Sequence, residues 1–401
     1  MKLLKIMDET LILETENTLP KDYDIACLIG RAWVPGNPDG PSPVWIKNGK
    51  VYDLAPYSPT ISQLLEKEDP ARIVRGLSGL HYIGSLEDLL KNTHPKQQDS
   101  SKPWFLAPCD LQAIKASGVT FVSSMLERVI EEQALGDWTM AEQIRKQINE
   151  LIGENLADIK PGSDAAMNVK KILIEKGAWS QYLEVGIGRD AEIFTKSQPM
   201  SAVGTGMEVG IHPGSNWNNP EPEIVLAVNS KGDVVGATLG NDVNLRDFEG
   251  RSALLLGKAK DNNASCAIGP FIRLFDDKFS LNDIRQANIS LTVDGLEGFR
   301  LEGNSSMKHI SRDPLDLVKQ CNGDYHQYPD GLMLFLGTMF SPTQDRDEPG
   351  QGFTHKVGDI ANIHTPLLGS LVNRVNTCDQ IPPWIFGTGA LMRNLAQRGL
   401  L

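Results

Sequence analysis

Apolar side chains recur with a helical period in one part of the chain and with a strand-like pattern in the rest. Met125, Leu126, Val129 and Ile130 fall on one helical face, which predicts an amphipathic helix over residues 123–135. The same spacing predicts helices over residues 139–152 and 163–177, each with a glycine at or just after its end. After Trp179 the pattern predicts mainly strands and turns.

The N-terminal part carries short apolar runs without helical periodicity. Residues 44–46 and 51–54 flank Asn48-Gly49, and an Asn-Gly pair between two apolar runs is a strong signal for a β-hairpin. Residues 92–102 are polar and turn-rich, which is typical of a linker. Since 401 residues exceed one ordinary domain, we expect a small, mostly β domain over residues 1–105 and a larger domain over residues 106–401.

A second predicted hairpin, over residues 220–242, carries three carboxylates. Two β-prone runs flank the turn-forming pair Lys231-Gly232. A two-residue loop centred between these residues makes the numbers of opposed residues sum to 463, so that Glu221 faces Asp242. Glu223 then points to the same face as Glu221, because side chains alternate along a strand.

Three carboxylates on one small patch repel each other unless a cation neutralises them. A hard divalent cation with oxygen ligands fits this set, and Mg²⁺ is the ion expected where a substrate and waters complete the shell, with Mn²⁺ and Ca²⁺ as further possibilities. This prediction depends on the register, since a shift by one residue moves Asp242 to the other face. An exposed acidic hairpin end without a metal explains the same spacing.

Composition and charge narrow the class of partner. A net charge of −12 disfavours binding to nucleic acid or to an anionic membrane. The apolar runs are shorter than a membrane span, and acidic residues follow the start of the chain too soon for a signal peptide. We therefore expect a cytoplasmic location. The five cysteines are far apart and form no CxxC pair, so we expect free thiols.

Other stretches leave alternatives open. Lys260 lies in a turn-rich segment soon after the acidic hairpin, where it could stabilise an enolate or exchange protons, although most lysines are solvated surface residues. Residues 341–356 form either an active-site lid or a solvated turn. The glycines at 186 and 188 approach a dinucleotide-binding fingerprint, but the residues that follow favour a strand and not a helix. The scattered histidines make a histidine zinc site unlikely to form, and no P-loop or GxSxG motif occurs.

Several motifs occur in the same order as in a known family. These are Pro-Glu221-Pro-Glu223, Asn-Asp242-Val-Asn-Leu-Arg246-Asp, Lys260 ahead of Cys-Ala-Ile-Gly-Pro, Leu-Gly337-Thr338 and Val-Gly-Asp359. From about Gly118 onward the chain resembles the fumarylacetoacetate hydrolase superfamily. The resemblance implies an α+β fold with a β-rich, mixed rolled sheet and a smaller N-terminal domain.

The resemblance also implies roles for individual residues. Glu221, Glu223 and Asp242 would bind Mg²⁺, and Lys260 would face the substrate. The resemblance places Arg246, Gly337 and Thr338 at the substrate, with Thr338 helping to hold its carboxylate. The expected substrate is a small 2-keto acid, and family members usually form homodimers or homotetramers.

One departure from the family pattern decides between activities. Hydrolases of the family resemble one another in a His-x-x-Glu pair that activates water, and here the matching positions are Ser124 and Glu127. A serine hydroxyl is no general base near neutral pH. The chain therefore resembles the branch that dehydrates 2-keto-3-deoxy-xylonate or its arabinonate epimer to 2-oxoglutarate semialdehyde, with Glu127 and Lys260 as the expected proton carriers.

Three alternatives remain. His355 or His212 could replace the missing base in an acylpyruvate-type hydrolase. A metal and enolate centre also supports oxaloacetate decarboxylation or tautomerisation. A binding protein that has kept the metal and lost the base is the alternative from outside the enzymes.

Overall fold

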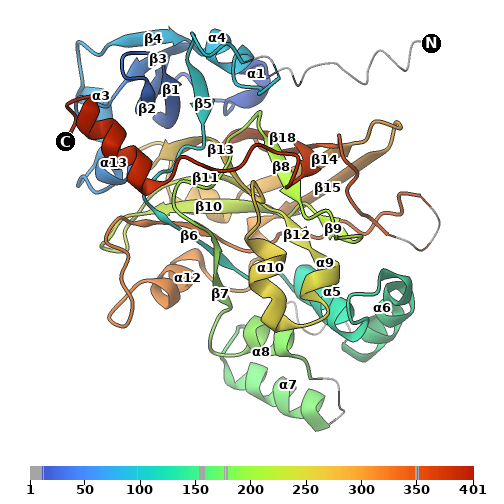
Figure 1. The fold of residues 1–401 in the computed structure, drawn as a ribbon. Coiled ribbons are helices and arrows are strands. Elements are labelled where there is room, and N and C mark those ends of the chain that lie inside the picture. Colours follow the sequence, from blue (N-terminus) through green and yellow to red (C-terminus); the bar gives the residue numbers. More distant parts are fainter. Residues whose placement is uncertain are drawn as a thin grey trace.

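The structure is a computed structural model, and it describes residues 11, 13–96, 98–152, 159–175, 177, 179–347, 350 and 352–401 (Figure 1). Its centre is an 11-stranded mixed sheet. In spatial order the strands are β4 (Tyr82–Ser85), β3 (Lys50–Asp53), β2 (Gly40–Lys47), β1 (Leu28–Val34), β13 (Cys266–Leu274), β11 (Val234–Asp242), β10 (Pro222–Val228), β16 (Leu332–Phe335), β6 (Ala113–Ser117) and β7 (Ile193–Ser197), and β5 (Trp104–Leu106) also pairs with β1.

A second sheet packs against the first. It has five strands in the order β15 (Arg300–Ser306), β14 (Asn288–Asp294), β17 (Ile360–Thr365), β18 (Gly369–Thr377) and β8 (Glu208–Ile211). Fully buried aliphatic residues of both sheets form one core cluster, among them Leu226, Leu239, Leu291, Ile363 and Leu371. A short pair, β9 (Asn218–Asn219) with β12 (Asn244–Leu245), lies directly before β10 and directly after β11 in the chain. The α+β fold with a β-rich mixed sheet is confirmed, and no strand order among the described residues closes into a barrel.

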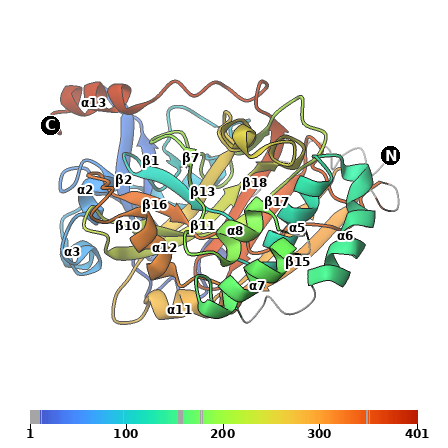
Figure 2. The same ribbon diagram turned by 90° about the horizontal axis from the view of Figure 1, so that it is seen from below.

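The helices are short, apart from a group on one side of the molecule (Figure 2). They are α1 (Thr15–Thr18), α2 (Ile61–Leu65), α3 (Pro70–Gly76), α4 (Leu86–Lys91), α5 (Val122–Gln133), α6 (Trp138–Ile152), α7 (Asp164–Glu175), α8 (Gln181–Ile187), α9 (Arg246–Glu249), α10 (Leu256–Lys260), α11 (Leu281–Arg285), α12 (Pro314–Cys321) and α13 (Thr388–Gln397). Apolar residues of α5 to α8 form a cluster of their own, separate from the core between the sheets.

The three helices predicted from periodicity are confirmed as α5, α6 and α7, with ends that differ by at most two residues. Helices after Trp179 were not expected. One of them, α12, carries a readable start signal, because Asp313 caps it and Pro314 occupies its first turn. The discounted glycine motif lies at the end of α8 and leads into β7, as predicted.

The acidic hairpin has the predicted register and a different turn. From Pro222↔Asn241 to Ala227↔Gly236 the numbers of paired residues sum to 463. The loop nevertheless has three residues centred on Lys231, since Asn229 and Asp233 hydrogen-bond and Gly232 has φ +86°. A bulge between Ala227 and Val228 adds the residue that restores the predicted register further along the ladder.

The N-terminal strands belong to the same large sheet as the rest of the chain. The Asn48-Gly49 turn joins β2 and β3 as predicted, with positive φ at both residues. The linker expected after Lys91 is instead a packed loop, because the buried Asn92 amide donates hydrogen bonds to the carbonyls of Asp99, Lys102 and Pro103. The domain boundary near residue 105 stays a prediction, with β1 pairing to strands on both sides of it. Among the described helices, none has the length and apolar character that crossing a membrane requires.

Candidate metal centre

Three carboxylates meet at the open end of the acidic hairpin. Glu221 directly precedes β10, Glu223 lies in β10, and Asp242 is the last residue of β11. The N–H of Asp242 donates a 3.1 Å hydrogen bond to the carbonyl of Glu221, which fixes the two residues opposite each other. One oxygen from each carboxylate lies within 4.8 Å of the other two, and all three side chains are buried. The hairpin therefore builds a site that could hold a metal ion.

Three cations contact two of these carboxylates directly. Lys260 Nζ lies 2.6 Å from Glu221 Oε2 and 3.2 Å from Asp242 Oδ2. Lys196 Nζ lies 2.8 Å from Asp242 Oδ1, and the Arg128 guanidinium pairs with Glu221 Oε1. All of these side chains are buried, so the charges are screened little by solvent.

These cations shift the pKa of the groups that they contact. Burial raises the pKa of Glu221, but the positive charges of Arg128 and Lys260 outweigh burial and bring it down to about 2. Burial lowers the pKa of Lys260, but the carboxylates of Asp242 and Glu221 outweigh burial and raise it. Both groups are therefore charged near neutral pH in the metal-free protein.

Glu223 differs from its two neighbours because its hydrogen-bond donors are uncharged. The backbone N–H of Gly337 donates to Oε2 at 2.7 Å, and the Thr338 hydroxyl lies 3.4 Å from Oε1. Burial, together with the charges of Asp242 and Glu221, raises the pKa of Glu223. Gly337 has φ +102°, and a Cβ there would lie 2.0 Å from the Thr120 hydroxyl, so glycine is required at this corner.

The donor set fits a hard divalent cation. With every group ionised, four cations (Arg128, Lys196, Arg246 and Lys260) face five carboxylates (Glu131, Glu221, Glu223, Asp242 and Glu249). Among the described residues, Glu223 has no cation within ion-pair distance. An oxygen-only set with spare negative charge is what Mg²⁺, Mn²⁺ or Ca²⁺ requires, and a bound divalent ion would leave net positive charge for an anionic ligand.

Helix α5 forms the wall opposite the hairpin, and it presents Arg128 to the triad. Arg128 also pairs with Glu131, three residues further along α5, and its Nε lies 3.5 Å from Glu249 Oε1. Sequence reasoning missed Arg128, a buried arginine that pairs with three glutamates, Glu131, Glu221 and Glu249. Apolar contacts with α8 and α6 set which side of α5 faces the hairpin.

Two residues expected to be catalytic lie on the same helix. Ser124 is buried, and its hydroxyl donates a 3.0 Å hydrogen bond to the carbonyl of Phe121. Glu127 accepts two 2.9 Å hydrogen bonds from Arg145 on α6. Glu127 is thus tied to a cation outside the triad, and its catalytic role stays a prediction.

Arg246 is buried beside the centre. Its Nε donates to Asn219 Oδ1 at 2.9 Å and lies 3.3 Å from Glu131 Oε1, and its Nη2 donates to the carbonyl of Pro342 at 3.2 Å. The guanidinium also lies 5.4 Å from the centre of the Trp217 ring. These contacts place Arg246 next to the triad, and its predicted role in substrate binding stays a prediction.

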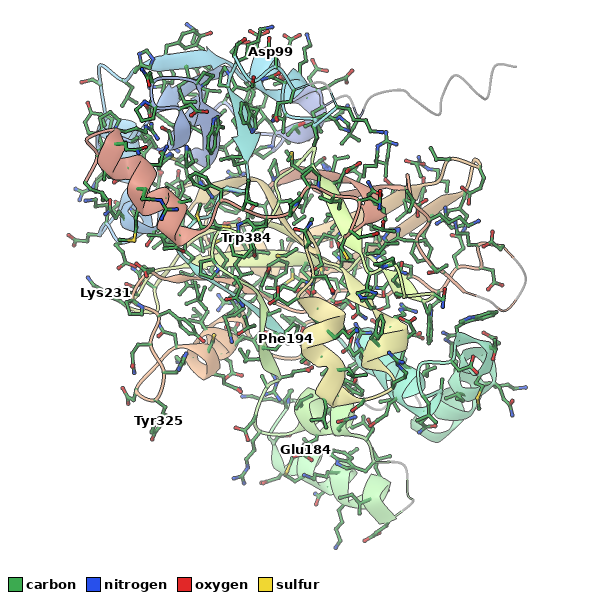
Figure 3. The ribbon with its side chains drawn as sticks, viewed as in Figure 1. Asp99, Glu184, Phe194, Lys231, Tyr325 and Trp384 are labelled. Carbon is green, nitrogen blue, oxygen red and sulfur yellow. The ribbon has the colours of Figure 1, made fainter. Side chains whose placement is uncertain are left out.

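Glu192 is a further carboxylate that sequence reasoning missed. Glu192 directly precedes β7. Phe194, in the same strand, lies beside α10 (Figure 3), and the centre of its ring is 5.6 Å from Lys260 Nζ. Glu192 is partly exposed. Burial, followed by the charge of Glu249, raises its pKa to about 7, against the opposite effects of Lys260 and Arg128. A carboxyl group that titrates near neutral pH beside a cluster of charges is suited to proton transfer.

The two histidines considered as replacement bases have different surroundings. His355 is buried, its Nδ1 lies 2.9 Å from Asp359 Oδ2, and burial lowers its pKa. His212 Nδ1 accepts a hydrogen bond from the N–H of Gly214, and its ring packs against Phe248. Part of the loop over residues 341–356 lies outside the described residues. Of the charges that are described there, Arg346 pairs with Asp359, and Asp345 accepts hydrogen bonds from the N–H groups of Gly350 and Gly352.

The part of the chain that carries the triad matches a known protein family. Residues 187–376 match the model of the fumarylacetoacetate (FAA) hydrolase C-terminal family. This part of the chain is similar in sequence to that family. The matched segment of the family domain contains the triad, Lys196, Lys260, Arg246 and Glu192, whereas α5 with Ser124, Glu127 and Arg128 precedes it.

Two curated relatives are each similar to about half of this chain. One is the "Probable 2-keto-3-deoxyxylonate dehydratase" of Haloferax volcanii, 28% identical over 196 residues, which are 49% of this chain and 64% of the relative. The other is the "2-dehydro-3-deoxy-D-arabinonate dehydratase" of Saccharolobus solfataricus, 28% identical over 184 residues, which are 46% of this chain and 58% of the relative. The match thus spans about three fifths of each relative's length.

A solved structure shares the fold over most of the chain. It is described as "2-keto-3-deoxy-D-arabinonate dehydratase complexed with magnesium and 2,5-dioxopentanoate", with a TM-score of 0.59 and 20% identity, and the alignment covers 87% of this chain and 99% of that one. This likeness shows a shared fold over a longer part of the chain than the segment that the family model matches.

Proposed function

We propose that this chain is a Mg²⁺-dependent dehydratase of a 2-keto-3-deoxy pentonate, either the xylonate or the arabinonate, with 2-oxoglutarate semialdehyde (2,5-dioxopentanoate) as the product. The observation that carries the proposal is the buried triad with Lys260 bridging Glu221 and Asp242. The names of the two curated relatives support the same reaction.

Bound Mg²⁺ would supply a chelating centre for the carboxylate and keto oxygens of the substrate, and charge stabilisation for the enolate that forms when the C3 proton leaves. Glu221, Glu223 and Asp242 would hold it. The Gly337 N–H and the Thr338 hydroxyl orient Glu223, while Lys196 orients Asp242.

Dehydration needs a base at C3 and an acid at the C4 hydroxyl. Glu192 is suited to the first role, because its pKa of about 7 leaves a substantial fraction deprotonated at neutral pH. Lys260 has three donors in the site, and its raised pKa suits it to stabilising the enolate oxygen as a cation more than to protonating the leaving hydroxyl. Glu127 is the alternative base, and it would first have to leave Arg145.

Acylpyruvate hydrolysis is the second candidate. The buried pair of His355 and Asp359 favours it, because a carboxylate that accepts a hydrogen bond from Nδ1 leaves Nε2 free to act as a base. Release of pyruvate from an acylpyruvate, lost in a His355→Gln variant, would establish this reaction.

The test uses purified protein stripped with EDTA, incubated with 2-keto-3-deoxy-xylonate with and without added Mg²⁺. We expect semialdehyde to form only with Mg²⁺. Pyruvate from an acylpyruvate, with no semialdehyde, would overturn the dehydratase in favour of the hydrolase. A homodimer or homotetramer and a cytoplasmic location stay predictions.

A further inference from the structure

The register of the hairpin that carries the triad continues in the separate two-stranded pair of β9 and β12. Asn219 on β9 pairs with Asn244 on β12, and these numbers sum to 463 like those of Glu221 and Asp242. Each member of the asparagine pair is two residues from a member of the carboxylate pair, so it lies on the same face at a distance of about 7 Å along the strand.

Buried polar atoms on this face lack hydrogen bonds. Neither the Oδ1 nor the Nδ2 atom of Asn244 bonds to any residue that the structure describes, although the residue is fully buried. The same holds for Nε1 of Trp217, which is 3% exposed and lies two residues before Asn219. Arg246 donates to Asn219, which pairs with Asn244 between β9 and β12, and its guanidinium lies 5.4 Å from the centre of the Trp217 ring. Buried polar groups are rarely left unpaired in native proteins.

The chemistry of these atoms selects a class of ligand. Asn244 offers a donor and an acceptor, and Trp217 offers a donor. Glu131 Oε1 and Glu249 Oε2 are buried acceptors in the same cluster that make no hydrogen bond within the described chain. A second anionic group would be repelled by these carboxylates, and an alkyl chain would leave Asn244 and Trp217 Nε1 without hydrogen bonds. A hydroxyl group can both donate and accept a hydrogen bond, so it can pair with the donors and with the acceptors of this site.

We propose that Trp217 and Asn244 bind the hydroxylated tail of the 2-keto acid whose head binds at the triad, and that they select sugar acids over keto acids with alkyl tails. This inference rests on the proposed function for the position of the head. It adds a specificity-determining pair that lies beside the metal ligands and includes none of them.

The test measures binding, with two acids that cannot undergo the dehydration because they lack the ketone. These are 2,4,5-trihydroxypentanoate and 2-hydroxypentanoate, which chelate a divalent cation through the same head and differ only in the tail hydroxyls. Calorimetry with Mg²⁺ should give at least about tenfold tighter binding of the trihydroxy acid to the wild-type chain, because a site built for hydroxyls rejects the analogue without them.

The variants Trp217→Phe and Asn244→Leu remove the unpaired atoms; the first keeps an aromatic ring, and the second keeps a side chain of similar shape. Each should weaken binding of the trihydroxy acid about three- to tenfold and change binding of 2-hydroxypentanoate less than about twofold. Trp33→Phe is the matched control, because Trp33 Nε1 already donates to Asp39 at 2.7 Å. It should change neither affinity. If Asn244→Leu does not fold, Trp217→Phe alone decides.

The experiment distinguishes a failure of the tail site from a failure of the proposed function. Equal binding of both acids to the wild-type chain would overturn the tail site and leave the metal centre standing. Equal weakening of both acids in the variants would also overturn it, since it would indicate a merely structural role. If neither acid binds in the presence of Mg²⁺, both the tail site and the proposed function are wrong.

Discussion

The two walls of the candidate centre place their side chains by different means. On the hairpin wall, Glu221 and Asp242 face each other because the backbone ladder between β10 and β11 fixes which residues are opposed. On the helix wall, Arg128 of α5 reaches Glu221, while the adjacent Glu127 turns to Arg145 on α6. Residue numbers alone predict which residues face each other in a β-ladder. Which residue of a helix faces the site also depends on how packing rotates the helix about its axis.

The largest effect is expected on the hairpin wall. Glu221→Gln removes the partner of two buried cations, Arg128 and Lys260. Breaking a buried pair in this way costs about 3–5 kcal/mol, because an uncompensated charge stays behind. We expect the free energy of unfolding of the metal-free protein to fall by this amount in urea titrations. Calorimetry should show Mg²⁺ affinity reduced at least about 100-fold.

Glu223→Gln is the matched control for that prediction. The groups that bond to Glu223 are the Gly337 N–H and the Thr338 hydroxyl, and its pKa is raised by burial and by the neighbouring carboxylates. Replacing this carboxylate should weaken Mg²⁺ binding as strongly as Glu221→Gln does, with no loss of stability in the metal-free protein. Equal destabilisation by both variants would show that the three carboxylates do not differ as their cation contacts indicate.

The next effect concerns proton transfer. Glu192→Gln removes the carboxyl proposed as the C3 base, and kcat should fall about 10²–10⁴-fold with the Mg²⁺ affinity retained. The pKa of Glu192 is raised to about 7, and a base must be deprotonated. The wild-type kcat/KM should therefore rise with pH up to about 7 and then level off. The residual activity of the variant should lack this rise, and a rise that persists would assign the titration to another group.

The same contrast explains what the sequence could predict. The metal triad followed from the register of a hairpin, and it survived a wrong turn prediction because a bulge at Ala227 compensated for the extra loop residue. Glu192, which directly precedes β7, and Lys196, which lies in β7, were missed because no local pattern shows that this strand runs beside α10. The role of Arg128 depends on α5 being held against α8, which is a tertiary contact. The helices α5, α6 and α7 were found by periodicity, and their orientation was not.

A smaller effect is expected from crowding Glu192. A Cβ at Gly118 would lie 1.7 Å from Glu192 Oε2 and 2.5 Å from its Cδ, so Gly118→Ala should displace the carboxyl while the flexible side chain moves aside. We expect kcat to fall about tenfold, as small misplacements of reacting groups are costly, with stability nearly unchanged. Gly76→Ala is the control, because a Cβ at Gly76 meets nothing within 4 Å. An unchanged kcat in Gly118→Ala would argue against Glu192 as the base.

The smallest effect is expected on the outer side of the helix wall. Glu127→Gln breaks the paired hydrogen bonds with Arg145, whose side chain is 25% exposed, so the loss of stability should be about 1 kcal/mol or less. Turnover should change less than about threefold, since this carboxylate is already held by a cation outside the triad. Arg145→Met breaks the same contact from the other helix and should match Glu127→Gln in both stability and turnover. If turnover instead collapses in Glu127→Gln and survives in Arg145→Met, Glu127 moves protons itself, and the helix wall contributes a catalytic group as well as the arginine that holds Glu221.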